Sequence, residues 1–215
     1  MATELKGVED KININKSIVL LLTALLVAGC GAEDAKPGPS EAVKPNTVAT
    51  TESDTAKADL QEATVLMQSN KYEEAIAKAD AILKQNPQND GAYAIKGMAQ
   101  GLNGDVEEGL VNEQKAYQLN PNNVSVYYNL AILYKLQGRL DESKTWFEKV
   151  LEKDPRNVWS IYGIATIYAD QGDDRLALDK LREAVQLDDQ VKQAARTQDH
   201  FARFHGNPQF EAIVK

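Results

Sequence analysis

The sequence contains very few of the residues on which metal and disulfide chemistry depend. Its 215 residues include one cysteine and two histidines. A single cysteine cannot form a disulfide framework, and so few soft ligands leave little from which to build a zinc site. The chain also lacks a basic excess, because 24 Lys and Arg against 32 Asp and Glu give a net charge of −8. Nucleic-acid binding needs a positive surface, so we expect no nucleic-acid partner, no metal and no cofactor.

A long hydrophobic run is also missing. The longest apolar stretch is IVLLLTALLVA, residues 18–28. At a helical rise of about 1.5 Å per residue it reaches roughly half-way across the hydrocarbon core of a bilayer, so it is too short for a transmembrane helix. Lys11 and Lys16 precede it and small residues follow it. This layout predicts a cleavable signal peptide over residues 1–29.

The end of this stretch reads Leu26-Val27-Ala28-Gly29-Cys30 and resembles the lipobox of bacterial lipoproteins. The resemblance implies cleavage between Gly29 and Cys30, and a diacylglycerol on the thiol of Cys30. Stable attachment needs more than one acyl chain, and a diacylated or triacylated cysteine meets that condition. The mature chain is therefore expected to be lipid-anchored in the membrane and extracytoplasmic. An ordinary secretory signal, or a buried helix with a chance cysteine, is the alternative.

The expected membrane face depends on the type of cell. Gly31 stands where the lipoprotein family's retention signal has Asp, so in a cell with two membranes the resemblance implies the periplasmic face of the outer membrane. In a cell with one membrane it implies the outer face of that membrane. The stretch that follows is rich in Pro, Ala, Thr and Ser and has no aromatic residue. Such a composition cannot bury enough apolar surface to offset chain entropy, so residues 30–55 are predicted to be a disordered tether.

Beyond the tether the sequence repeats every 34 residues. The period is marked by Pro87, Pro121 and Pro155, and by Gly104, Gly138 and Gly172. Small residues share it, at Ala63, Gly97, Ala131 and Ala165, and again at Ala75, Gly109, Ser143 and Ala177. A fixed period of this length is typical of repeat architectures. Glycine suits the left-handed end of a helix and proline stops a helix, so we predict two closely packed helices per repeat.

These columns resemble the tetratricopeptide repeat, most clearly in residues 124–157. Four units are expected, with the bounds 56–89, 90–123, 124–157 and 158–189. The resemblance implies an all-α fold of about four helix pairs stacked as a right-handed superhelix, because no single pair covers its own apolar face. The sequence departs from the family pattern at Glu62, Lys96, Gly109 and Asp189.

Residues 190–215 are predicted to cap the open end of the solenoid. We expect a further helix over residues 191–197. The apolar side chains beyond it recur at roughly helical spacing, and they are Phe201, Phe204, Phe210, Ile213 and Val214. We expect these side chains to be buried against the last repeat. His200 and His205 are interpreted as surface or cap residues rather than as functional ones.

Catalytic motifs are absent from the sequence. It has no nucleophile elbow, phosphate-binding loop, dinucleotide fingerprint or zinc-protease motif. Paired acidic residues such as Glu107-Glu108 and Asp141-Glu142 recur after the mid-repeat turn, where the helix dipole stabilises negative charge. The acidic cluster at residues 170–174 lacks the spacing of a calcium loop. We therefore expect the chain not to be an enzyme.

The resemblance also implies that the first helices of the repeats line a concave groove that binds a peptide. The residues at groove positions are Tyr128, Asn129, Ile132, Lys135, Trp159, Tyr162 and Thr166. Aromatic side chains dominate interface energetics, and an asparagine offers a peptide backbone both a donor and an acceptor. Tighter packing inside the solenoid is the alternative role for each of them. The family's carboxylate clamp is not expected, because Asn129 alone matches it.

Together these features predict a membrane-anchored, extracytoplasmic adaptor. It would bind a protein or peptide partner in envelope assembly, in secretion, pilus or cell-wall machinery. Two alternatives stay open at this point. One is a structural solenoid that self-associates through its ends, and the other is a lipoprotein that captures a small solute in a closed pocket.

Overall fold

A computed structural model describes residues 47–215 of the chain, and their side chains from residue 55 onward. The predicted signal peptide and Cys30 lie outside these residues. The helices are α2 Thr47–Gln68, α3 Tyr72–Gln85, α4 Asp90–Leu102, α5 Val106–Leu119, α6 Val124–Leu136, α7 Leu140–Lys153, α8 Val158–Gln171, α9 Asp174–Leu187, α10 Gln190–Thr197, the 3-10 helix η1 Asp199–Phe204, and α11 Pro208–Val214. None of the described helices is both long and apolar enough to cross a bilayer.

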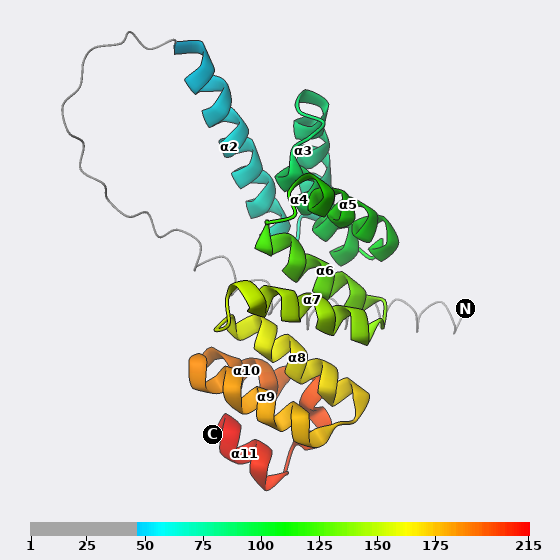
Figure 1. Cartoon of the computed structure of the whole chain (residues 1–215), viewed down its shortest axis with the longest axis vertical. Coiled ribbons are helices and arrows are strands. Elements are labelled where there is room, and N and C mark those ends of the chain that lie inside the picture. Colours follow the sequence, from blue (N-terminus) through cyan, green and yellow to red (C-terminus); the bar gives the residue numbers. More distant parts are fainter. Residues whose placement is uncertain (1–46) are drawn as a thin grey trace, which may run out of the picture.

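The helices pack in consecutive pairs, α2 with α3, α4 with α5, α6 with α7 and α8 with α9. The pairs stack along the long axis of the molecule, with α2 at one end and α11 at the other (Figure 1). The first helices of successive pairs are neighbours, since α4 contacts both α2 and α6. The predicted all-α solenoid of four helix pairs is therefore confirmed, and its first helices share one face.

The turn that ends each first helix explains the glycine column. Gly104, Gly138 and Gly172 have φ angles of 107°, 74° and 84°, which lie in the left-handed region that glycine enters without steric penalty. The first unit has Asn70 at this position, with φ of 60°. Asparagine tolerates that region better than most residues. Glycine thus recurs every 34 residues because the backbone at this turn needs a positive φ angle.

The start of α2 differs from the prediction. A disordered tether was expected to reach residue 55, but the helix begins at Thr47. Proline stops a helix, and the last proline before the first repeat is Pro45. The helix of the first repeat can therefore begin as early as Thr47. The remainder of the predicted tether lies outside the described residues.

Two departures from the repeat pattern are matched by opposite charges on a neighbouring helix. Lys96 in α4 lies 2.7 Å from Asp80 in α3. Glu62 in α2 lies 2.6 Å from Lys78 in α3, which also binds Asp59. Each charged residue that departs from the repeat pattern thus has a partner of opposite charge on the adjacent helix.

The C-terminal cap forms as predicted. The side chains of Phe201, Phe204 and Phe210 are buried, and their ring centroids lie 5.8–6.1 Å apart. Ile213 and Val214 in α11 are buried as well, and α11 packs against α9. The three phenylalanines belong to the same continuous core as the repeats, so the cap closes the apolar end of the solenoid.

Candidate functional site

A hollow of about 300 Å³ opens on the face formed by the first helices α2, α4 and α6. We call it the open pocket. Its lining residues are Leu60, Thr64, Met67, Gly91, Ala94, Ile95, Asn123, Ser125, Tyr128 and Asn129. None of these side chains is charged, and aliphatic and aromatic groups dominate the lining. Such a surface favours an apolar ligand that forms a few hydrogen bonds.

Asn129 is held in place from behind the open pocket. Its Nδ2 donates a hydrogen bond of 2.8 Å to Oε1 of Glu113 in α5. Because the amide nitrogen is engaged with Glu113, the carbonyl oxygen of Asn129 is the group that remains for an N–H donor in the pocket. Glu113 thus fixes the orientation of the Asn129 amide, one of the polar groups in a mainly apolar lining.

Glu113 itself is an unusual residue for a helix interface. Its side chain has no exposed surface, and Oε2 has no hydrogen-bond partner among the described residues. Burial raises the pKa of this carboxyl well above its usual range, and the hydrogen bond from Asn129 opposes the shift only in part. The buried carboxyl is therefore favoured in its neutral form.

The other half of the same face is covered by the C-terminal segment of the chain. We call residues 198–205 the covering segment, and η1 within it packs against α8. The ring of Phe201 packs at a tilt against that of Tyr162, with centroids 5.8 Å apart. The hydroxyl of Tyr162 donates a hydrogen bond of 2.9 Å to Oε1 of Gln198. A partner reaches this part of the face only if the covering segment moves.

Four polar side chains from three elements meet under the covering segment. Nζ of Lys135 in α6 donates a hydrogen bond to Oγ1 of Thr166 in α8, and it lies 3.7 Å from Oδ2 of Asp170. It also lies 3.2 Å from Nε2 of His200 in η1. The other ring nitrogen of His200, Nδ1, is 2.7 Å from Oδ1 of Asp170. We call Lys135, Thr166, Asp170 and His200 the polar cluster.

The polar cluster holds an ammonium group in a nearly dry position. The Lys135 side chain is only 11% exposed. Burial lowers the pKa of Lys135 to about 8, although the charge of Asp170 and its hydrogen bond act in the opposite direction. Burial alone would raise the pKa of Asp170, but the hydrogen bond from His200 and the charge of Lys135 together lower it. Both groups are charged at neutral pH.

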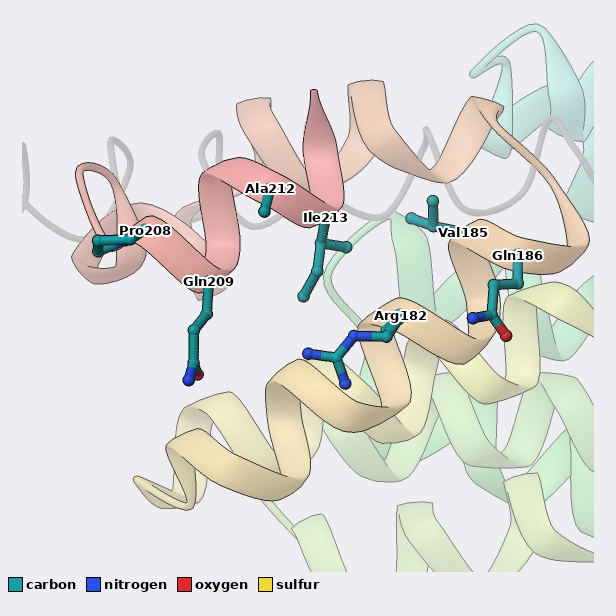
Figure 2. Close-up of a pocket in the computed structure, with 7 residues that line it drawn as sticks. All are labelled: Arg182, Val185, Gln186, Pro208, Gln209, Ala212 and Ile213. Carbon is teal, nitrogen blue, oxygen red and sulfur yellow. The ribbon is translucent and has the colours of Figure 1, made fainter.

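A second hollow, of about 470 Å³, lies between α9 and α11 at the outer end of the cap (Figure 2). Its lining residues are Arg182, Val185, Gln186, Pro208, Gln209, Ala212 and Ile213. The guanidinium of Arg182 already donates to Asp179 at 2.9 Å. Nowhere in the described part of the chain do three or more His, Cys, Asp or Glu side chains gather as a metal site would require.

The family model of the tetratricopeptide repeat matches residues 60–124 and again residues 124–157. Residues 60–157 consist of tetratricopeptide repeats. They include α4, α5 and α6, and hence the open pocket and Glu113. No curated protein sequence matches the chain.

Solved structures of tetratricopeptide repeat proteins share the fold. PilF of Pseudomonas aeruginosa superposes with a TM-score of 0.65 at 13% identity, over 76% of this chain and 73% of PilF. PilW, a type IV pilus biogenesis factor, gives a TM-score of 0.61 at 19% identity, over 74% of this chain and 78% of PilW. YrrB, described as having an unusual peptide-binding site, gives 0.54 at 16% identity, over 79% of this chain and 89% of YrrB.

The residues predicted to form one groove separate into three environments. Tyr128 and Asn129 line the open pocket. Tyr128 is nevertheless 2% exposed, and its ring packs edge-on against Phe147 at 5.5 Å. Ile132 is 1% exposed and belongs to the core between repeats. Of these three, Asn129 presents the most surface to a partner.

The remaining predicted residues lie under or beside the covering segment. Tyr162 and Thr166 are fully buried, and Lys135 belongs to the polar cluster. Trp159 is 7% exposed and packs edge-on against Tyr162, with centroids 5.8 Å apart. Thus the repeats place these side chains on the expected face, and the cap then covers that face.

Sequence reasoning missed the α2 side of the open pocket and the carboxyl behind it. Leu60, Thr64 and Met67 come from the first unit, which departs from the repeat pattern at Glu62. Glu113 had a signal, because the residues one and two periods later are Phe147 and Leu181. A carboxyl in an apolar column indicates a residue kept for a reason other than packing.

Proposed function

We propose that the chain is a membrane-anchored, extracytoplasmic adaptor that holds a protein or peptide partner in the open pocket. The observation that supports it best is the combination of a mainly apolar hollow with a fixed acceptor, Asn129, on the first-helix face. A hollow of this kind accepts the side chain of an apolar residue while the acceptor takes a backbone N–H. The same combination argues against a highly charged ligand, because the pocket has no charge to offer it.

The proposed partner is a segment of a protein in an envelope assembly. Similarity to PilW, a pilus biogenesis factor, and to YrrB, with its peptide-binding site, supports this choice of process and ligand. Both similarities are of fold, so the partner is to be identified by experiment.

The anchor is tested at Cys30. Replacing Cys30 with serine removes the thiol that the lipobox resemblance assigns to acylation, so we expect fatty-acid labelling to disappear and the protein to leave the membrane fraction. Both are measured in the cells that produce the full chain. A Cys30→Ser protein that is still labelled and membrane-bound would show that the lipobox interpretation is wrong.

The open pocket is tested by introducing a charge that its lining cannot match. Ser125 lies exposed on the pocket wall, so Ser125→Arg should block an apolar ligand with little effect on folding. We expect a photo-crosslinking amino acid at position 64 to capture a partner, and Ser125→Arg to abolish the crosslink.

The matched control is Val111→Arg, because Val111 is 60% exposed on α5, outside the pocket. This variant should keep the crosslink, and thermal unfolding should be similar for both variants. If Ser125→Arg and Val111→Arg crosslink equally well, the open pocket is not the binding site.

A further inference from the structure

We propose that the open pocket binds the indole ring of a tryptophan in a partner protein, with the indole N–H donating to the side-chain carbonyl of Asn129. The inference rests on the proposed function, because it names the chemistry of the partner in the same pocket. The lining of the pocket, the contact on the adjoining half of the face and the aromatic residues of this chain each support it.

Several polar side chains of the open pocket already use their protons within the chain. The hydroxyl of Thr64 donates a hydrogen bond of 2.8 Å to the carbonyl of Leu60, and the amide nitrogen of Asn129 is engaged behind the pocket. The amide of Asn123 both donates and accepts within the chain. Thr64 and Asn129 therefore present oxygen lone pairs to a ligand, and they favour one that brings an N–H or O–H donor.

The rest of the lining determines which donor fits. None of the lining side chains is charged, so an ammonium or guanidinium group would lose its hydration without gaining a counter-charge. An indole N–H is a neutral donor that brings no acceptor, and its ring buries a large apolar area. A tyrosine hydroxyl donates as well, but burial leaves the lone pairs of its oxygen without a donor from Thr64 or Asn129.

The adjoining half of the first-helix face already holds an aromatic side chain. There the ring of Phe201 packs against Tyr162, which stands 34 residues after Tyr128 of the open pocket. The two halves are continuous through α6, since this helix contributes Tyr128 and Asn129 to the pocket and Lys135 to the polar cluster. An aromatic occupant of the open pocket would extend this contact along the same face.

This chain does not supply the indole ring itself. Its two tryptophans are Trp146 and Trp159. Trp159 is buried, and Trp146 packs edge-on against Tyr117 and lies 3.7 Å below the ammonium of Lys149. Residues 1–46 contain no aromatic residue. The occupant is therefore a segment of another protein rather than the N-terminal part of this chain or a second copy.

The test compares neutral peptides that differ only at their central residue. One carries tryptophan, and a second carries benzothienylalanine, in which sulfur replaces the indole N–H with nearly the same shape. Two more carry phenylalanine and leucine. Binding to the purified full chain is followed by nuclear magnetic resonance through the isotope-labelled methyl group of Met67, which lines the pocket. Peptide concentrations reach about 1 mM, so that weak binding is detected.

We expect the tryptophan peptide to bind about tenfold more tightly than the benzothienylalanine peptide, the change that corresponds to one hydrogen bond. The phenylalanine and leucine peptides should also bind more weakly than the tryptophan peptide. Two results would overturn the proposal. One is equal binding of tryptophan and any of the other three residues, and the other is a Met67 signal that the tryptophan peptide does not shift.

Two variants identify the acceptor. Asn129→Leu removes the carbonyl, and Ile95 one period earlier shows that this column accommodates an aliphatic side chain. In this variant the preference for tryptophan over benzothienylalanine should disappear. Thr64→Val removes a hydroxyl of similar size from the α2 side of the pocket and should keep the preference. A preference that persists in Asn129→Leu, or that is lost in Thr64→Val, would contradict the assignment to Asn129.

These titrations use synthetic peptides, so their failure leaves the adaptor function to be judged by the crosslink from position 64 in cells. Conversely, a tryptophan peptide that binds as expected while no partner is captured in cells counts against the adaptor function alone. Where both hold, the captured segment of the partner should contain a tryptophan, and a segment without one would overturn the indole assignment.

Discussion

Replacing Gly109 with alanine is expected to lower the free energy of unfolding by about 2 kcal/mol. A Cβ at this position would lie 2.6 Å from the carbonyl oxygen of Gly97 and 2.9 Å from the nitrogen of Gly101. Both contacts are to backbone atoms of α4, so the two helices must move apart. Overpacking of this kind costs up to about 3 kcal/mol, and the better helix propensity of alanine returns about 1 kcal/mol. Urea denaturation followed by circular dichroism measures the difference.

The matched control is Gly91→Ala on α4, the helix against which Gly109 of α5 packs. There the nearest neighbours of a new Cβ are side-chain atoms of Asn89 and Leu60 at 3.4 Å, which is ordinary van der Waals contact. That variant should be as stable as the natural chain or slightly more stable. If Gly109→Ala and Gly91→Ala behave alike, the close approach of α4 and α5 does not limit the size of residue 109.

The close approach also shows which parts of the fold are predictable from a single sequence. The left-handed turns and the small residues between paired helices arise from requirements that recur with the period, and the buried aromatics of the cap follow from their helical spacing. The left-handed conformation of Gly138 can therefore be predicted without knowing the residues that surround it. The start of α2 at Thr47 was missed because it lies before the period begins.

The candidate site was only partly predictable, for a different reason. The period places Lys135, Tyr162 and Thr166 on the first helices of their repeats, but it does not tell whether that face is free. His200 and Phe201 cover this part of the face, because they follow the last repeat and fold back over α8. That contact is tertiary, and no spacing within the repeats encodes it.

The two halves of the face consequently differ in chemistry. The open pocket presents an apolar lining with the acceptor of Asn129, whereas the covered half buries a charged cluster beneath aromatic rings. Each half contains one buried ionisable residue, Glu113 or Lys135, and burial disfavours the charged form of each. Groups with such shifted pKa values cluster at functional sites, which makes both residues candidates for the function of the face.

Replacing Glu113 with glutamine is expected to raise the free energy of unfolding near pH 8 by at least about 1.4 kcal/mol, the free energy that corresponds to a tenfold change in the acid dissociation constant of the carboxyl. Burial raises the pKa of Glu113 in the folded protein. The folded state therefore keeps a proton that the unfolded state loses above the ordinary glutamate pKa, and the natural chain loses stability as pH rises through this window. Glutamine cannot ionise, so the advantage of the variant should grow with pH and vanish near pH 4. Urea denaturation of both proteins across this range measures it.

Glu142→Gln provides a control of opposite sign. The hydrogen bond from Arg139 lowers the pKa of Glu142, so this carboxylate stabilises the fold above its ordinary pKa and its removal should not raise stability at pH 8. Glutamine at position 113 can still accept the hydrogen bond from Asn129, so partner capture in the open pocket should survive. Glu113→Leu, which matches Leu181 two periods later, should be at least as stable but should release the Asn129 amide. If Glu113→Leu captures the partner as well as Glu113→Gln does, Glu113 does not position Asn129 for binding.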